Sequence, residues 1–220
     1  MQLRAADFAY QTIKSKILSL EYEPGLRLKE VQLAQKLELT RTPIREAFIK
    51  LERERLLTIY PNKGAFVVRL SKTEIEELFE VREALEAKAG HLTIRRANRD
   101  ELALVKAALD REKANARNTL DHLQWPATDF HYEIIKLTKN QRLISIWESL
   151  DAQLSLMRHR SAVLDKRYFT ALEEHDRILA YIAGGNYKKT EKLIIAHIRK
   201  ARNNLLSQLD DKSQEANGLP

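Results

Sequence analysis

Residues 24–67, PGLRLKEVQLAQKLELTRTPIREAFIKLERERLLTIYPNKGAFV, carry the pattern from which the architecture of the N-terminal part follows. Pro24-Gly25 ends a helical pattern that begins near the N-terminus, and two more helices are predicted at 30–37 and 41–55. In the second of these, apolar residues recur at the spacing of one helix face: Ile44, Ala47, Phe48 and Leu51. The stretch therefore predicts three short helices in succession.

Two β-prone runs follow the third helix, at 57–60 and 65–68. They flank Pro-Asn-Lys-Gly at 61–64, a set of residues typical of a turn, so the sequence predicts a hairpin. Three helices followed by a hairpin are the layout of a winged helix-turn-helix.

The start of the third helix gathers side chains suited to reading DNA. Four polar or basic residues stand there, off the apolar face: Thr40, Arg41, Thr42 and Arg45. Arginine engages guanine through two hydrogen bonds, threonine reaches phosphate or base edges, and a helix N-terminus attracts phosphate. At the hairpin tip, Lys63 and Gly64 suit entry into a minor groove, since glycine permits close backbone approach. The alternative is that these charged side chains only cover a solvent-exposed helix face and bind no DNA.

Residues 8–70 resemble the N-terminal domain of GntR-type regulators, most specifically in TRTPIREA, residues 40–47. The resemblance implies that the six residues just named contact DNA. The mechanism expected here is that two protomers form a homodimer and place two recognition helices in successive major grooves, about 34 Å apart, on a near-palindromic operator. Glu38 and Arg55 depart from the family, which usually has glycine in the turn and after the recognition helix.

Basic charge is concentrated in the same region. The net charge is +7, and residues 1–70 carry 13 Lys and Arg against 8 Asp and Glu, whereas residues 71–220 carry 25 against 23. This excess suits neutralisation of a phosphate backbone. The sequence has no cysteine, which excludes disulfides, and no apolar run long enough to span a bilayer. We expect a cytoplasmic protein without membrane association.

Beyond residue 70 the pattern is helical throughout. Ser71 with Glu74, and Asn98 with Glu101, have the spacing with which helices begin. Further helices are predicted at 126–139, 141–163, 168–183 and 186–209. The sequence thus predicts a mainly α chain with a winged helix-turn-helix domain over 1–70, an all-α helical bundle over 71–209 and a flexible tail over 210–220.

The helical part resembles the FCD effector domain of the FadR branch of GntR regulators. The matching stretches are FEVREALEAKA, FHYEIIKLTKN and EEHDRILAYIAGGNYKKTEKLIIAHI. The resemblance implies that this domain dimerises and encloses a cavity for a small carboxylate, often with a divalent metal. A small organic acid is therefore the expected effector.

Two charged residues fall on an apolar helix face. Arg82 and Glu86 lie in the stripe of the helix that begins after Ser71. Because a buried charge is costly unless paired, two explanations stand: an internal ion pair, or an arginine that holds a ligand carboxylate in its planar fork. Arg158, at the edge of another apolar stripe, is either a second ligand-binding residue or a surface arginine.

Three histidines also point inward, each from a separate predicted helix: His131, His175 and His197. One inward histidine is usually a hydrogen-bonded core residue, but these three stand where the resembling family places metal-binding histidines. Imidazole suits divalent transition metals, and zinc or nickel is the expected ion. Ala127 departs from the family, which typically has an acidic ligand one turn before the first histidine. Three protein ligands would leave positions for water or an effector carboxylate.

Three functions compete for this pattern. A metal-dependent enzyme can use a three-histidine site with an open position, yet no general base, nucleophile motif or glycine-rich phosphate loop accompanies it. A nonspecific architectural DNA binder has little use for the large helical domain. The expected function is a sequence-specific transcription regulator, by default a repressor, that responds to a small organic acid. Whether the acid releases or promotes DNA binding stays open.

Overall fold

The computed structural model describes residues 5–61, 63–118, 130–163 and 167–217. The chain forms two compact units. Met1–Ser71 and Ser149–His159 make up the first, and Lys72–Glu148 and Arg160–Pro220 the second. The domain bounds expected from the sequence, 1–70, 71–209 and 210–220, stay predictions.

Three helices of the first unit support its candidate site: α1 (Ala5–Leu18), α2 (Glu30–Lys36) and α3 (Arg41–Arg53). α3 packs against both α1 and α2. The apolar face predicted for α3 is confirmed, since its four residues are at most 2% exposed: Ile44, Ala47, Phe48 and Leu51. Burial of this face leaves the opposite side of α3 at the surface.

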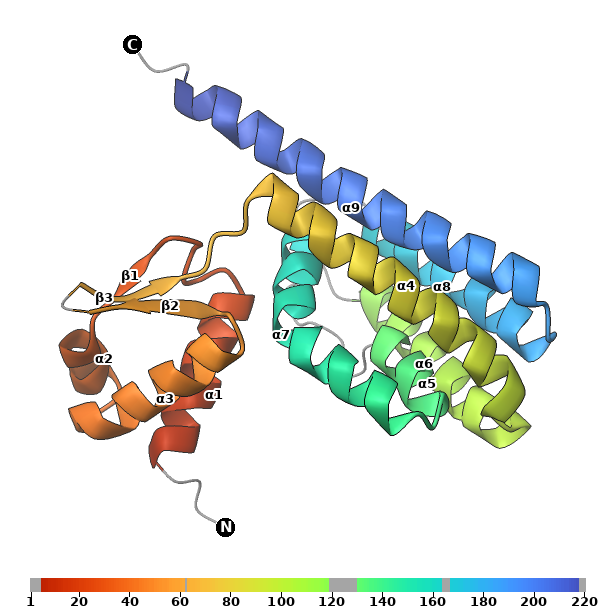
Figure 1. Cartoon of the computed structure of the whole chain (residues 1–220), viewed down its shortest axis with the longest axis horizontal. Coiled ribbons are helices and arrows are strands. Elements are labelled where there is room, and N and C mark those ends of the chain that lie inside the picture. Colours follow the sequence, from red (N-terminus) through yellow and green to blue (C-terminus); the bar gives the residue numbers. More distant parts are fainter. Residues whose placement is uncertain (1–4, 62, 119–129, 164–166, 218–220) are drawn as a thin grey trace. The chain divides into compact units, whose positions relative to one another are not determined.

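A three-stranded antiparallel sheet follows, with β1 (Arg27–Leu28), β2 (Leu57–Tyr60) and β3 (Gly64–Val67) in the order β1-β3-β2 (Figure 1). The predicted hairpin is confirmed, and Tyr60 lies opposite Gly64. β1 was not predicted, because a strand of two residues is too short to show alternation. It pairs with β3, where Arg27 lies opposite Phe66.

Three described residues of the first unit other than glycine have left-handed backbone: Leu20 and the two that follow α2 and α3. Glu38 after α2 and Arg55 after α3 have φ angles of 55° and 56°. The next residues, Leu39 and Leu56, each donate their backbone N–H back into the preceding helix at 2.9 Å. This is the Schellman cap, in which glycine is the usual residue. The family's turn geometry is therefore kept, at a cost of about 1–2 kcal/mol for each side chain in this conformation.

The second unit is helical and contains α4 (Lys72–Arg96), α5 (Arg99–Asn118), α6 (Phe130–Leu137), α8 (Arg167–Ala183) and α9 (Tyr187–Asn217), whereas α7 (Gln141–Val163) is divided between the two units. The predicted start of α5 is confirmed, because the backbone N–H groups of Asn98 and Glu101 each donate to the other's side chain at 2.8 Å. α9 continues past Leu209, where the sequence indicated a tail. Its residues up to 217 contain no glycine or proline that would end it.

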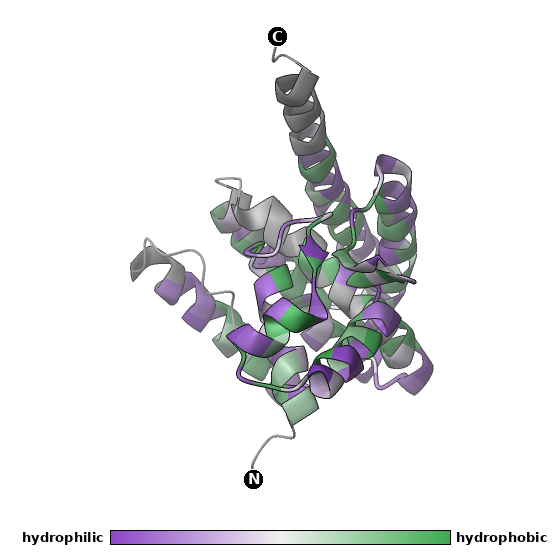
Figure 2. Cartoon of the chain, turned by 90° about the vertical axis from the view of Figure 1, so that its left-hand side faces the viewer, coloured by the Kyte–Doolittle hydropathy of each residue, from purple (hydrophilic) through white to green (hydrophobic). Residues whose placement is uncertain are grey.

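α4 organises this unit by packing against α6, α8 and α9 (Figure 1). Its approach to α9 depends on Gly90, where an added Cβ would lie 2.7 Å from Cδ1 of Ile194 and 2.9 Å from Cγ2 of Thr190. Hydrophilic and hydrophobic residues mix along each helix (Figure 2), and no described helix combines the length and apolar character of a membrane span. The buried face of α4 contains polar as well as apolar residues, including Arg82 and Glu86.

Candidate functional sites

The first turn of α3 is exposed because its apolar face is buried on the other side. Arg41, Thr42 and Arg45 all lie at the surface. Thr40 is the N-cap residue in extended conformation, and its side chain makes no capping hydrogen bond. Four of the six residues predicted to contact DNA thus present their polar groups from a single helix turn.

Glu30, the first residue of α2, binds two of these side chains. Its Oε1 accepts a hydrogen bond from Nε of Arg45 at 3.1 Å, and its Oε2 accepts from Nη2 of the same arginine at 2.9 Å. Nη2 of Arg41 also donates to Oε2, at 3.1 Å. The hydrogen bonds from Arg45, followed by those from Arg41, lower the pKa of the Glu30 carboxyl. Both arginines keep about three fifths of their side chains exposed, at 60% and 61%.

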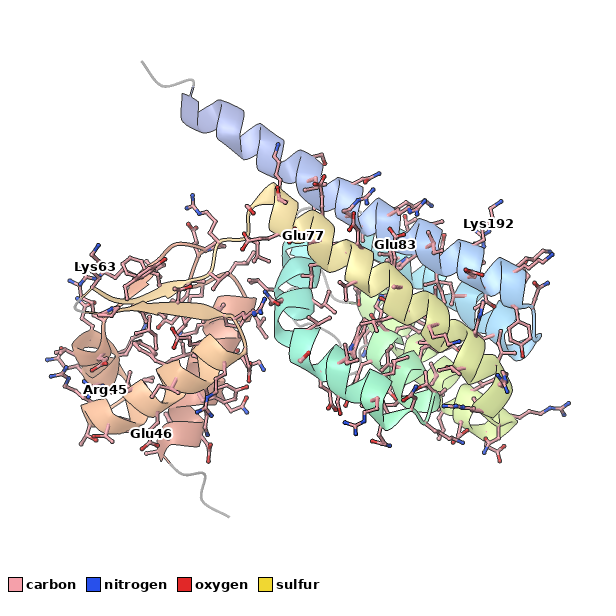
Figure 3. The ribbon with its side chains drawn as sticks, in the orientation of Figure 1. Arg45, Glu46, Lys63, Glu77, Glu83 and Lys192 are labelled. Carbon is pink, nitrogen blue, oxygen red and sulfur yellow. The ribbon has the colours of Figure 1, made fainter. Side chains whose placement is uncertain are left out.

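The remaining two predicted residues lie at the tip of the hairpin. Lys63 is exposed, and Gly64 has a φ angle of 97°, which residues with side chains rarely adopt. A Cβ on Gly64 would lie 3.5 Å from Nε of Arg27, so this exposed arginine lies against the bare glycine. In Figure 3, Lys63 and Arg45 project from the same edge of the first unit.

A polar cluster lies inside the second unit. Arg82 is 1% exposed and Glu86 6% exposed, on the buried stripe of α4 as the sequence predicted. Nε of Arg82 donates to Oε1 of Glu86 at 2.6 Å, which is the internal ion pair. The guanidinium also reaches beyond its partner, since its Nη2 lies 3.0 Å from Nε2 of His131 on α6. The ion pair is therefore part of a larger cluster.

The three predicted histidines meet in this cluster. They come from α6, α8 and α9, and their candidate ligand atoms all lie within 4.8 Å of one another. Nε2 of His197 lies 3.3 Å from Nε2 of His175 and 3.4 Å from Nε2 of His131. The ring of Phe130 stacks on His175 with centroids 4.3 Å apart.

Carboxylates fix the orientation of two of these rings. Nδ1 of His131 lies 2.7 Å from Oε2 of Glu86, and Nδ1 of His197 lies 2.7 Å from Oε2 of Glu174. Because an ionised carboxylate only accepts hydrogen bonds, each Nδ1 carries the proton and each Nε2 presents a lone pair. Nδ1 of His175 has no hydrogen-bond partner among the described residues.

Burial favours the neutral form of two rings of the cluster, His175 and His197. Burial lowers the pKa of His175 well below its ordinary value, and the neighbouring His197 and His131 lower it further. Burial likewise lowers the pKa of His197, although Glu174 opposes the shift. The neutral imidazole, which offers an unprotonated ring nitrogen, is the form in which histidine binds metals.

These residues fit a metal ion. Two nitrogens held roughly 2.0–2.1 Å from one tetrahedral Zn²⁺ lie about 3.3 Å apart, close to the two measured Nε2 separations. The carboxylates behind His131 and His197 match the partners that metal-bound histidines usually have. Arg82 donates to the lone pair of His131 that such an ion needs, so the guanidinium must yield when a metal binds there.

The sequence did not reveal every residue of these sites, and two of the residues that it indicated lie outside the described part of the chain. It did not single out Glu30, Arg27 or Glu174, because nothing in their spacing along the chain shows which arginine, glycine or histidine they meet. Two earlier predictions fall outside the described residues: the side chain of Arg158, and Ala127 at the position of the family's acidic ligand.

Comparisons with known proteins divide the chain into two matches. Residues 5–67 match the family described as "Bacterial regulatory proteins, gntR family", and residues 77–200 match the FCD domain. The Bacillus subtilis (strain 168) protein "Uncharacterized HTH-type transcriptional regulator YdhC" is 29% identical over 86% of this chain and 85% of its own length. The "Nta operon transcriptional regulator" of Aminobacter aminovorans is 28% identical over 83% and 86%.

The fold has counterparts among solved structures. "E. coli McbR/YncC" aligns with a TM-score of 0.78 over 94% of this chain and 100% of that chain, at 19% identity, which is a likeness of fold. The matched families and the named relatives are DNA-binding transcription regulators and not enzymes, so the enzyme alternative has no support.

Proposed function

The chain belongs to the GntR family of bacterial regulatory proteins and carries the FCD domain of its FadR-like branch, and we propose that it is a repressor whose operator binding is controlled by a small organic acid. Two protomers associate through their helical domains and place two α3 helices in successive major grooves, about 34 Å apart, on a near-palindromic site. The protein acts in the cytoplasm.

One observation carries this proposal: a single chain combines an exposed arginine-threonine helix start with an enclosed arginine-histidine cluster. The first suits base edges and phosphates, and the second suits a carboxylate. A relative named as an operon regulator supports control at an operator.

The effector site that we propose is formed by Arg82 with a divalent ion at His131, His175 and His197. FCD domains bind metal ions, and the three-histidine cluster fits one. Zinc or nickel is the proposed ion, because both accept imidazole nitrogen. A metal supplies positive charge and open positions to a carboxylate, whereas Arg82 supplies two parallel donors.

DNA reading is tested with Arg41→Ala in a binding titration at fixed salt, on a duplex that the wild-type protein selects from a random-sequence pool. Losing a base contact should weaken binding by about 1–3 kcal/mol and relax the preference at one base pair. Arg142→Ala, an exposed arginine of α7, is the matched control. Equal affinity of both variants would contradict the assignment of α3.

Effector control is tested with Arg82→Ala. The variant should bind the selected duplex like the wild type but lose its response to a panel of small mono- and dicarboxylates, added with and without Zn²⁺ or Ni²⁺. Arg199→Ala, which breaks an exposed contact with Glu83, is the control. If Arg82→Ala still responds, Arg82 serves only the internal ion pair. Metal analysis of purified protein that finds no stoichiometric divalent ion would reject the metal.

A further inference from the structure

Glu30, the first residue of α2, binds two arginines at the start of α3, where the proposed base contacts lie. Its two oxygens accept three hydrogen bonds, two from Arg45 and one from Arg41. The Glu30 side chain is 24% exposed, less than half of either arginine. The Glu30 side chain is therefore more protected from solvent than the two arginines that it binds.

The contact with Arg45 uses one edge of the guanidinium and leaves another edge open. Nε and Nη2 donate to Glu30 in the parallel, two-bond geometry that fixes the plane of the group. Arginine has five N–H donors, and the contact with Glu30 uses two of them, so it does not use the hydrogens of the Nη1–Nη2 edge. Two adjacent donors on one edge are what bidentate recognition of guanine O6 and N7 requires.

We propose that Glu30 is a positioning residue, which orients the guanidinium of Arg45 so that it contacts a base edge and not only phosphate. This inference rests on the proposed DNA-binding function and deepens it. A guanidinium that a carboxylate already holds loses less conformational entropy when it binds a base edge. The affinity for DNA with the matching base therefore increases. The same carboxylate offsets positive charge at the surface, so phosphate contacts of any sequence become weaker.

Removing the charge of Glu30 therefore has two opposite effects. In Glu30→Gln, affinity for random duplex should rise and its dependence on salt should steepen by up to about one counterion. Preference for the selected duplex over random duplex should fall by at least about fivefold, the lower end for one bidentate arginine–base pair. A purely structural role of Glu30 would weaken binding to both duplexes together and lower the melting temperature.

The experiment measures both affinities of the full-length protein over a salt series, for wild type, Glu30→Gln and Glu30→Ala. Glu46→Gln is the matched control. Glu46 follows Arg45 in the chain, is exposed, and makes no hydrogen bond or ion pair with another described residue (Figure 3). Glu46→Gln removes the same charge close to Arg45 without removing a contact with an arginine, so it should leave the preference unchanged.

A double-mutant cycle shows whether Glu30 acts through Arg45. In an Arg45→Ala background, adding Glu30→Gln should change the preference by less than about twofold. The proposal is overturned if Glu30→Gln keeps the wild-type preference, if Glu46→Gln loses as much, or if the loss persists without Arg45. A wild-type protein that prefers no duplex would overturn the proposed DNA reading itself, and this inference with it.

Discussion

Replacing Glu174 by glutamine tests whether the carboxylates behind the histidines tune a metal site. Oε2 of Glu174 lies 2.7 Å from Nδ1 of His197, and Oε1 accepts a hydrogen bond from Nζ of Lys200 at 2.6 Å. Glutamine keeps the size of the side chain but is neutral, and only its carbonyl oxygen can accept a hydrogen bond, whereas both oxygens of Glu174 accept one. Nε2 of His197 should then become a weaker donor to the ion.

The size of the effect follows from the partners that remain. Loss of a carboxylate behind a metal-binding histidine typically weakens metal affinity by about 10–100-fold. The ion pair with Lys200 already offsets part of the charge of Glu174. The substitution also leaves the contact between Glu86 and His131 unchanged. We therefore expect the lower half of this range, about 10–30-fold, which corresponds to roughly 1.4–2 kcal/mol of binding free energy.

Competition for Zn²⁺ against a chromophoric chelator measures this change directly, without DNA or effector. Glu83→Gln is the control, because Glu83 lies on α4 and accepts hydrogen bonds from Arg199 at 3.0 and 3.1 Å without contacting a histidine (Figure 3). The reasoning fails if Glu174→Gln binds Zn²⁺ as tightly as the wild type. It also fails if Glu83→Gln weakens binding to the same extent.

Two further predictions concern stability, measured by denaturant unfolding. Replacing Glu38 or Arg55 by glycine removes about 1–2 kcal/mol of left-handed strain, whereas the greater entropy of the unfolded chain costs about 0.4–1 kcal/mol. Each change should therefore stabilise the protein by up to about 1.6 kcal/mol. A loss of stability would contradict the cap geometry. Gly90→Ala places a Cβ 2.7 Å from Ile194 and should destabilise by about 1–3 kcal/mol, whereas Gly184→Ala meets no atom closer than 3.4 Å and should cost less. Equal free energies of unfolding for the two would refute the close approach of α4 and α9.

The architecture of the first unit was predictable because its signals are local. The face formed by Ile44, Ala47, Phe48 and Leu51 can be read from spacing alone, and burial follows from it. β1 was missed because its pairing with β3 joins residues far apart in the chain. Glu38 and Arg55 show a different limit. Caps and packing hold both turns left-handed, although their side chains disfavour that conformation.

The members of the histidine cluster were predictable, but their connections were not. Helical spacing placed His131, His175 and His197 on inward faces, and the family resemblance grouped them. The contact between Arg82 and His131 spans 49 positions, and that between Glu174 and His197 spans 23. No periodicity encodes such distances, because they depend on how the helices pack. Which carboxylate meets His131 and which meets His197 was therefore visible only in the structure, although the sequence had already placed Glu86 on the buried face of its helix.

The charges of the cluster explain why an acid suits it as the proposed effector. Neutral histidines bring no negative charge to a divalent ion, and Arg82 adds a positive one beside them. The two carboxylates at hand are already engaged, Glu86 by Arg82 and Glu174 by Lys200. A buried ion in such surroundings is costly unless another negative group enters. An organic carboxylate would supply that charge, and it would also give the guanidinium a partner in place of the lone pair of His131 that a bound metal would need.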